Sequence, residues 1–355
     1  MNKVSFFYND SKGMQKTDPF KTPVRSTLSQ VAERAGVSPS TVSRILNGTA
    51  QVSELKKASV LKAIEDLNFL PDPAARSLAG GRAMSIGVLT QFIDSPFYGE
   101  ALRGIEDVLL KSGYAPLFVS GHWNEAEENL RIQMLMQRKV DGIIVLTGKL
   151  QDATLVSIAR QMPVVVTGRQ LRKPNLLGLD FDNRAGVSLA VRHLYDLGHQ
   201  RIGFISGPLD HADAEQRLQG YQMELKQLRI RCDAKLVVDG DFSEPGGYRA
   251  TQQLIQSGAG FTALIAANDQ MAYGARLALH RAGLRVPEDV SLVGFDDLPH
   301  SAYMLPPLTT VRQPIYELGA STARAVLQLL AGEQAEMPQM PAELVVREST
   351  RRSRS

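Results

Sequence analysis

Between residues 27 and 69, the apolar side chains recur at the spacing of short amphipathic helices. Thr27 and Gln30 are placed to form a capping box, in which the Thr hydroxyl accepts from a backbone N–H and the Gln side chain reaches back to the cap. The apolar positions then follow helical spacing as far as Gly36, a residue that tolerates the left-handed conformation at a helix end. The pattern predicts a first helix over 28–35.

A second helix is predicted directly after this one. Ser38 can cap it, and Pro39 suits its first position because a proline there gives up an N–H that would have no intrahelical partner. Its apolar positions continue to the Asn-Gly pair at 47–48. Two short helices joined by a tight, Gly-containing turn are typical of a helix-turn-helix, whose second helix can lie in the major groove of DNA. Paired short helices also occur in proteins that bind no DNA, so this spacing alone leaves both interpretations open.

A third helix closes this small unit. Ser53 is placed as its cap, and Leu61, Ile64 and Leu67 recur at i, i+3 and i+6. We expect these three side chains to complete a miniature three-helix core that ends near residues 68–71.

From residue 85 onward the pattern changes to short apolar runs that alternate with longer helical stretches. Continuous apolar strands alternating with helices indicate parallel sheets that are covered on both faces. About 260 residues exceed one doubly wound unit, so we expect an α/β body of two lobes facing a cleft, as in periplasmic sugar-binding proteins. The predicted strands are 86–89, 116–119, 142–146, 164–167, 201–206, 236–238, 263–267 and 291–294, and the predicted helices are 101–112, 125–138, 183–197, 216–228 and 270–282.

Composition adds little until the charges are placed along the chain. The 355 residues are 43% hydrophobic and 22% charged, which excludes a disordered or collagen-like chain, and the net charge is only +3. Residues 1–82, however, hold 12 Lys or Arg and 7 Asp or Glu, an excess of five positive charges, which leaves two net negative charges for the rest. A basic end joined to a slightly acidic body is the layout expected when one part meets phosphates, although the excess is modest.

Cysteine content and hydropathy bear on the compartment. Cys232 is the only cysteine, which excludes an intrachain disulfide framework or a cysteine-rich zinc site. Neither a signal-peptide core nor a run of about 18 apolar residues is present, so we expect a cytoplasmic protein in a reducing compartment. We expect disordered tails at 1–26 and 348–355, a headpiece at 27–72, a linker at 73–82 and a two-lobed body at 83–347.

The chain resembles the LacI/GalR family of bacterial transcription regulators. The resemblance begins in the uninterrupted run VAERAGVSPSTVSRILN (31–47) and continues in ARSLA (75–79). It extends through most of the body, to about residue 347. The family has the two-lobed body already expected here, and the resemblance implies a homodimeric repressor that binds a near-palindromic operator and responds to a small effector.

The resemblance assigns DNA contacts to the headpiece. Pro39, Ser40 and Arg44 stand where the family's second helix points side chains at base edges, and only Arg44 can pair with guanine through two hydrogen bonds, so readout should depend mainly on it. Short hydroxyl and amide side chains stand where the family grips phosphates, which fixes register without specifying bases. These are Thr27, Ser38, Thr41, Ser43, Asn47 and Ser53.

Leu78 lies in an otherwise polar linker between Pro73 and Gly80. In the family the equivalent segment folds into a hinge helix on the operator, and its leucine enters the minor groove. Such a wedge unstacks a base step at a cost of a few kcal/mol and kinks the duplex. We therefore expect Leu78 to be the wedge.

The effector site is expected where strands end, because ligands of doubly wound sheets bind beyond the carboxyl ends of the strands. Carboxylate, amide and guanidinium groups beside aromatic rings suit a polyhydroxylated ligand. The resemblance is close in RLQGY (217–221), ANDQMA (267–272) and VGFDD (293–297). It places Asp94, Arg169, Arg217, Phe242, Asn268 and Asp296 at or near effector contacts, and Phe97, Tyr98, Gln91 and Gln313 are weaker candidates. Asp269 and Asp297 are interpreted as helix caps.

Other functions fit the sequence less well. None of the six His residues is paired with a second His or Cys at metal-ligand spacing, and no nucleophile elbow or phosphate-binding Gly loop follows a strand, so neither an enzyme nor a metal or cofactor site is expected. A solute-binding protein would lack the headpiece. The C-terminal end has no leucine heptads for a tetramer, so a dimer is expected. A small sugar is the favoured effector; Arg169 and Arg217 leave room for an acidic sugar, and a purine corepressor is the alternative.

Overall fold

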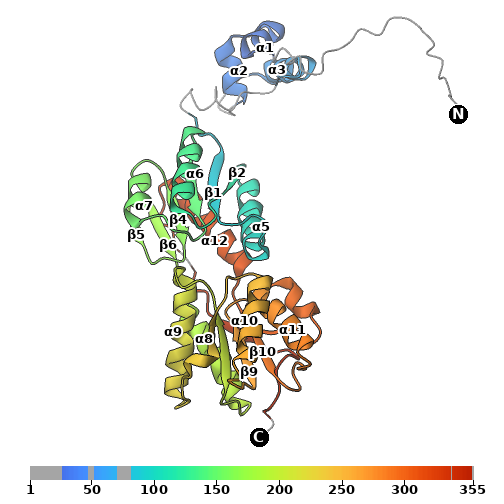
Figure 1. Cartoon of the computed structure of the whole chain (residues 1–355). Coiled ribbons are helices and arrows are strands. Elements are labelled where there is room, and N and C mark those ends of the chain that lie inside the picture. The colour runs from blue at the N-terminus through green and yellow to red at the C-terminus, as the bar shows by residue number, and fades with distance from the viewer. Residues whose placement is uncertain (1–25, 47–51, 70–80, 337, 354–355) are drawn as a thin grey trace, which may run out of the picture. The chain divides into compact units, whose positions relative to one another are not determined.

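The structure is a computed structural model, which describes residues 26–46, 52–69, 81–336 and 338–353. The chain divides into two compact units, residues 1–81 and 82–355 (Figure 1). Asn47, Leu78 and the linker over 73–80 lie outside the described residues.

The first unit contains the three predicted helices, α1 (Leu28–Ala35), α2 (Pro39–Leu46) and α3 (Glu54–Asp66). Both hydrogen bonds of the capping box between Thr27 and Gln30 are present, and Gly36 ends α1 with φ of 67°. The hydroxyl of Ser38 accepts from the backbone N–H of Thr41 at 3.2 Å. These elements follow the local signals of the sequence, and their prediction is confirmed.

The core of this unit differs from the expected one. Leu61 is 51% exposed, whereas Val60 and Ala63 are buried in the same helix. Ile64 and Leu67 are only partly buried against a core formed by Val31, Ala32, Val42, Val60, Ala63 and Phe69. The expected core position of Leu61 was wrong, because the small Ala63, and not the larger leucine, faces α1 and α2. Ser53 precedes α3 but makes no side-chain capping bond.

The second unit consists of two lobes, each built on a six-stranded, mostly parallel sheet. The first lobe has the strand order β2-β1-β3-β4-β6-β5, and the second β12-β11-β10-β9-β7-β8. Among the described strands, the antiparallel pairs are β5 with β6 in the first sheet and β12 with β11 in the second. The first sheet contains β1 (Ser85–Thr90), β2 (Ala115–Ser120), β3 (Gly142–Val145), β4 (Val164–Thr167), β5 (Arg172–Lys173) and β6 (Leu176–Leu179). The second contains β7 (Ile202–Ser206), β8 (Val237–Asp239), β9 (Ala263–Ala266), β10 (Ser291–Asp296), β11 (Thr309–Arg312) and β12 (Glu343–Val345).

Helices cover the faces of both sheets (Figure 1). The first lobe carries α5 (Pro96–Lys111), α6 (Glu125–Gln137), α7 (Asp152–Ala159) and α12 (Ile315–Ala331), and the second carries α8 (Asn183–Asp196), α9 (Ala212–Gln227), α10 (Glu244–Gln256) and α11 (Asp269–Arg281). Alternate residues of β1 enter opposite cores, since Val88 packs in the cluster with α5 and α12 while Leu89 packs in the cluster with α6 and α7. This alternation explains why the strands are apolar throughout. The predicted strands and helices of the body are confirmed, whereas α7, α10 and α12 and the strands β5, β6 and β12 were not predicted.

The chain crosses between the lobes near residue 180, at 313–314 and again between α12 and β12. The last two crossings arise because α12 packs on the first lobe, although it follows β11 and precedes β12 of the second sheet in the chain. The expected disordered tail at 348–355 was wrong for residues 348–353. Ser349 is buried, accepts from the backbone N–H of Thr309 at 2.8 Å and donates to the carbonyl of Leu292. Ser353 donates its N–H to the carbonyl of Leu197. These partners lie far away in the sequence. The contacts of this polar, basic segment could therefore not be predicted from its own residues.

Candidate functional site

A cavity of about 390 Å³ lies between the lobes, beyond the carboxyl ends of their parallel strands. The first lobe contributes side chains that follow β1 and β2, and the second contributes side chains that follow β7 to β10. Five of the six main effector candidates line it, namely Asp94, Arg217, Phe242, Asn268 and Asp296, and so do the weaker candidates Phe97 and Tyr98. The strand-end rule therefore located the cavity correctly.

Arg217, on α9, is the central cation of this cavity, and its side chain is only 5% exposed. Its Nε donates to Asn183 Oδ1 at 2.8 Å, and its Nη1 donates to the carbonyl of Ala267 and lies 3.8 Å from Asp296 Oδ1. The guanidinium also covers the ring of Phe295, with its Cζ 3.9 Å from the ring centroid. These contacts fix the planar group without help from a ligand, so it is preorganised for binding.

Asp296, the last residue of β10, is the acidic partner of Arg217 in this cavity. It accepts from Gln313 Nε2 at 2.8 Å, which ties it to the crossing at 313–314. Burial raises the pKa of Asp296 to about 8, although the nearby Arg217 opposes the rise. Its φ of 119° is a conformation that L residues rarely adopt, and such backbone strain is found preferentially at ligand sites.

The raised pKa of Asp296 makes stability depend on pH. The ordinary value is 3.8, so the folded chain holds this proton more tightly than the unfolded chain does. The resulting stabilisation is complete below about pH 4 and is lost as the pH rises toward about 8. We expect Asp296→Asn to flatten the fall in the free energy of unfolding between about pH 5 and 8, measured by denaturant titration of the full chain.

A residual fall should remain in this variant, because burial also raises the pKa of Asp269 to about 6. The control is Asp94→Asn, which removes an exposed carboxylate from the same cavity. An equally steep fall in Asp296→Asn and in the wild type would contradict the assignment.

Phe242 and Asn268 line the same cavity as Arg217 and Asp296. A Cβ at Gly207 would lie 2.2 Å from the ring of Phe242, so only glycine at the end of β7 leaves space for the ring. Asn268 caps α11 by accepting from the N–H of Met271 at 2.9 Å, and its Nδ2 donates to the carbonyl of Phe242 at 2.9 Å. The amide therefore has a structural role while it lines the cavity.

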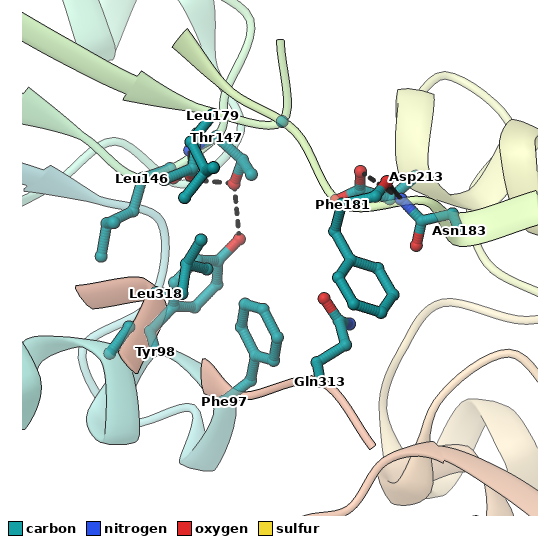
Figure 2. Close-up of a pocket in the computed structure, with 13 residues that line it drawn as sticks. Phe97, Tyr98, Leu146, Thr147, Leu179, Phe181, Asn183, Asp213, Gln313 and Leu318 are labelled. Carbon is teal, nitrogen blue, oxygen red and sulfur yellow. Dashed lines mark hydrogen bonds between the residues drawn. The ribbon is translucent and has the colours of Figure 1, made fainter. Parts of the chain in front are cut away.

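The first lobe presents aromatic rings from the start of α5. Phe97 and Tyr98 pack edge to face with their ring centroids 5.3 Å apart. The hydroxyl of Tyr98 hydrogen-bonds with that of Thr147 at 3.1 Å. Figure 2 shows these rings opposite Phe181 and Gln313. The four side chains line a smaller cavity of about 20 Å³. Gln313 lines this smaller cavity, and its Nε2 donates to the carboxyl group of Asp296.

Arg169 does not join the others. It lines an adjoining cavity of about 480 Å³, donates to Asp152 Oδ1 at 2.7 Å and also donates to the carbonyl of Gly148. Gln91 is buried and lines neither large cavity. Asp94 is exposed at the rim of the 390 Å³ cavity.

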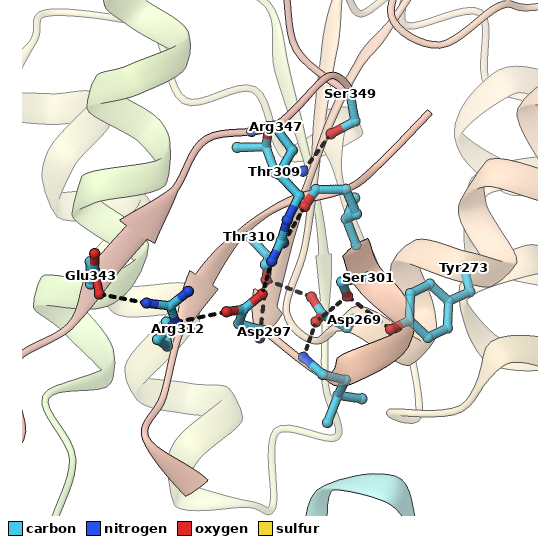
Figure 3. A network of polar contacts seen from close by, with 12 residues as sticks. Asp269, Tyr273, Asp297, Ser301, Thr309, Thr310, Arg312, Glu343, Arg347 and Ser349 are labelled. Atoms are coloured by element: carbon cyan, nitrogen blue, oxygen red, sulfur yellow. Dashed lines mark hydrogen bonds and ion pairs between the residues drawn. The ribbon is translucent and has the colours of Figure 1, made fainter. Parts of the chain in front are cut away.

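The interpretation of Asp269 and Asp297 as caps was wrong. Asp269 is a buried acceptor that receives bonds from the hydroxyls of Ser301 and Thr310 and from the N–H of Leu298 (Figure 3). Asp297 instead accepts from Arg312 at 2.7 Å and from Arg347 at 2.6 Å. The capping role falls one residue earlier, on Asn268, because the hydroxyls that satisfy Asp269 come from distant parts of the chain.

Two cavity residues were missed by sequence reasoning. Trp123 follows β2 and His211 follows β7, and their rings stack with centroids 3.7 Å apart. The strand-end rule applies to both positions, but nothing in the sequence shows that they meet across the lobes.

As a whole, the cavity combines a buried guanidinium, a carboxyl group and an amide with the rings of Phe97, Trp123 and Phe242. Such a set can exchange hydrogen bonds with several hydroxyl groups while an aromatic ring covers an apolar face of the ligand. Within the described residues, no group of three or more His, Cys, Asp or Glu side chains could hold a metal ion. None of the described helices is long and apolar enough to cross a membrane.

The candidate DNA-contact residues lie in and around α2. Thr27, Ser38, Pro39, Ser40, Arg44 and Ser53 are exposed, and Thr41 and Ser43 are half-buried. The Nε of Arg44 donates to the carbonyl of Ser40 at 3.3 Å, so the side chain runs back along its own helix. Ser38 hydrogen-bonds with the hydroxyls of Ser40 and Thr41. One short stretch thus presents hydroxyl groups, helical N–H groups and one guanidinium to solvent.

Comparisons with known proteins agree with both units. Residues 27–72 match the family of bacterial regulatory proteins of the lacI type, and residues 191–350 match a periplasmic binding protein-like domain. The HTH-type transcriptional regulator GalR of Escherichia coli (strain K12) is 37% identical over 305 residues, which are 86% of this chain and 89% of that protein.

Solved structures extend the likeness to the whole fold. The lac repressor dimer bound to operator and the anti-inducer ONPF has a TM-score of 0.83 and 32% identity, and the match covers 92% of this chain and 99% of that one. The complex of the transcriptional regulator CelR with cellobiose has a TM-score of 0.68 and 32% identity, covering 92% of this chain and 100% of that one. The chain belongs to the LacI/GalR family of bacterial transcription regulators.

Proposed function

We propose that this protein is a homodimeric, operator-binding repressor of a carbohydrate-utilisation operon. A small sugar-like effector bound between the lobes would set its affinity for DNA. The observation that carries the effector site is the buried Arg217–Asp296 pair beside Phe242 in a cavity between two lobes. The relative that binds cellobiose in a body of the same fold supports a sugar in this place.

The DNA half of the proposal rests on the headpiece. Each headpiece offers few base contacts, so two copies on a near-palindromic operator are needed for useful specificity. The relative that binds its operator as a dimer supports this arrangement. Acting on DNA and a small effector, the protein would work in the cytoplasm and carry no enzymatic activity.

The two halves are coupled through lobe movement. A ligand that prefers one separation of the lobes shifts the population toward it, and the linker segments of a dimer are joined directly to the first lobes. The effector therefore changes operator affinity only to the extent that it binds one arrangement of the lobes more tightly than another.

Ligand screening by thermal unfolding tests the effector class. A sugar at about 100 times its Kd should stabilise the full chain by about 2.7 kcal/mol, which corresponds to a rise in Tm of about 5–10 °C. The screen should contain neutral sugars, sugar acids and nucleobases. A shift with nucleobases alone would replace the sugar by a purine corepressor, and no shift with any sugar would contradict the proposal.

The wedge assignment of Leu78 has its own test. We expect Leu78→Ala to weaken binding to the operator by about tenfold or more, because the kinked complex loses the side chain that holds the base step open. Binding to a random duplex, which depends on phosphate contacts and salt, should stay nearly unchanged. Anisotropy titrations on both duplexes measure this, with Ser77→Ala as the neighbouring control. Equal losses on both duplexes would remove Leu78 from the wedge role.

A further inference from the structure

The stack of Trp123 on His211 joins the two lobes inside the cleft. The rings lie 3.7 Å apart between centroids and 15° from parallel, so no ligand ring fits between them. Trp123 precedes α6 in the first lobe, and His211 precedes α9 in the second. Both side chains line the 390 Å³ cavity.

This stack stands where the two large cavities of the cleft meet. Trp123 and Asp213 line both the 390 Å³ cavity and the 480 Å³ cavity that contains Arg169. On the side of the larger cavity, Lys149 of the first lobe donates to Asp210 of the second at 2.6 Å. The bond between Lys149 and Asp210 is therefore a second contact between the lobes, in the same cavity lining as Trp123.

Both contacts rest on the same buried pair in the first lobe. The Oε1 of Gln91 accepts from the backbone N–H of Trp123 at 2.7 Å. The carboxylate of Glu128, which is fully buried, accepts from the backbone N–H groups of Lys149 and Leu150, each at 2.9 Å. A buried carboxylate needs such bonds to be tolerated, so the positions of both segments are specified by the fold.

His211 has an unsatisfied polar atom at the same place. Its side chain is about nine-tenths buried, and its Nδ1 makes no hydrogen bond within the described part of the chain. A buried polar atom without a partner is costly, so this ring is held by its packing against Trp123 and not by a hydrogen bond of Nδ1.

We infer that Trp123 and His211 form an end wall that limits the effector to a single sugar ring. The inference rests on the proposed sugar effector and deepens it, because it names the size class. The cavity on the Phe242 side is near the small end of the range of about 300–1,000 Å³ that ligand pockets span. A second ring that extended past Trp123 would have to enter the cavity that contains Arg169, and the stack of Trp123 on His211 blocks that direction.

Calorimetry on the full chain tests the wall with defined probes. The monosaccharides are D-galactose, D-glucose and D-ribose, and the disaccharides are melibiose, lactose and cellobiose. We expect the wild type to bind a monosaccharide at least about tenfold more tightly than any of the disaccharides, and Trp123→Ala to shift that ratio toward a disaccharide by about tenfold or more. An unchanged ratio in the variant, or a wild type that prefers a disaccharide, would overturn the inference.

A measurement without ligand separates this inference from the proposed function. Trp123 is the only tryptophan of the chain, so its fluorescence reports on the wall alone. We expect His211→Ala to shift the emission to the red and to increase quenching by acrylamide, while the control His280→Ala, on the exposed side of α11, changes neither.

The outcomes of the two experiments are distinct. If His211→Ala leaves both emission and quenching unchanged, the stack is absent in solution and the wall is refuted whatever the ligand is. If the stack is present but the wild type binds no sugar, the proposed sugar effector fails and the one-ring limit falls with it.

Discussion

Replacing Arg217 by Met is expected to abolish the effector response of the full chain while operator binding persists. The guanidinium is the buried cation of the cavity, and each hydrogen bond that a charged group gives to a ligand is worth about 1.5–3 kcal/mol. Losing two such bonds weakens effector binding by about 100-fold or more. Methionine keeps much of the side-chain volume beside Phe295. The measurement is the effector concentration that releases half of the labelled operator.

A second variant separates effector binding from stability. Without Arg217 the carboxylate of Asp296 has no cation beside it, which destabilises its ionised form. Above about pH 8, where Asp296 ionises, Arg217→Met combined with Asp296→Asn should therefore recover the stability that Arg217→Met loses, but not the effector response. The control Arg184→Met removes an exposed arginine that pairs with Gln219 outside the cavity. A normal dose–response curve in Arg217→Met would remove this residue from the site.

Replacing Arg44 by Ala is expected to cause the largest loss of operator specificity among headpiece variants. A bidentate pair between arginine and guanine contributes about 1–3 kcal/mol of discrimination, and a dimer makes the contact in two half-sites. The affinity for the operator should then fall by about 30-fold or more. Anisotropy titrations on the operator and on a random duplex of equal length measure the two affinities.

The matched control is Arg34→Ala, which removes one positive charge from α1 of the same headpiece. Arg34 is ion-paired with Asp66 at 3.2 Å, and its place on α1 is outside the expected reading helix. Both variants should lose a similar, small amount of affinity for the random duplex, because that binding depends on charge. An Arg44→Ala protein that still prefers its operator as strongly as Arg34→Ala does would refute the base-reading role.

The first two helices could be predicted from the sequence because their limits are set locally. The capping box of Thr27 and Gln30, Gly36 and Pro39 act within one turn of chain. The core contacts of α3 were less accessible, since choosing between Leu61 and Ala63 requires the positions of α1 and α2.

Two of the three missed body helices, α10 and α12, were missed for identifiable reasons. The first turn of α10 contains Pro245, Gly246 and Gly247, which look like a loop in the sequence. Gly247 is required because a Cβ there would lie 2.1 Å from the carbonyl oxygen of Met271. α12 has small residues where it meets α5, and a Cβ at Gly319 would lie 2.0 Å from the carbonyl of Ala101. Such close contacts between helices leave no clear amphipathic pattern in the sequence.

For the site, the strand-end rule predicted where the residues gather but not how they pair. It placed Arg217 and Asp296 in one cavity although 79 positions separate them in the chain. It did not distinguish Asn268 from Asp269 as the cap, because Ser301 and Thr310 decide that choice from elsewhere. It also could not show that Trp123 meets His211, since that contact depends on how the two lobes face each other.

We expect a sugar between the lobes and an operator at the headpiece to be coupled in one protein. If they are, the factor by which the sugar weakens operator binding must equal the factor by which the operator weakens sugar binding. Anisotropy of labelled operator measures the first factor, and the fluorescence of the single Trp123 in the cleft measures the second. We predict equal factors between about 5 and 150, with no such effect on a random duplex. An operator affinity that stays unchanged at saturating sugar would show that the two sites are not coupled.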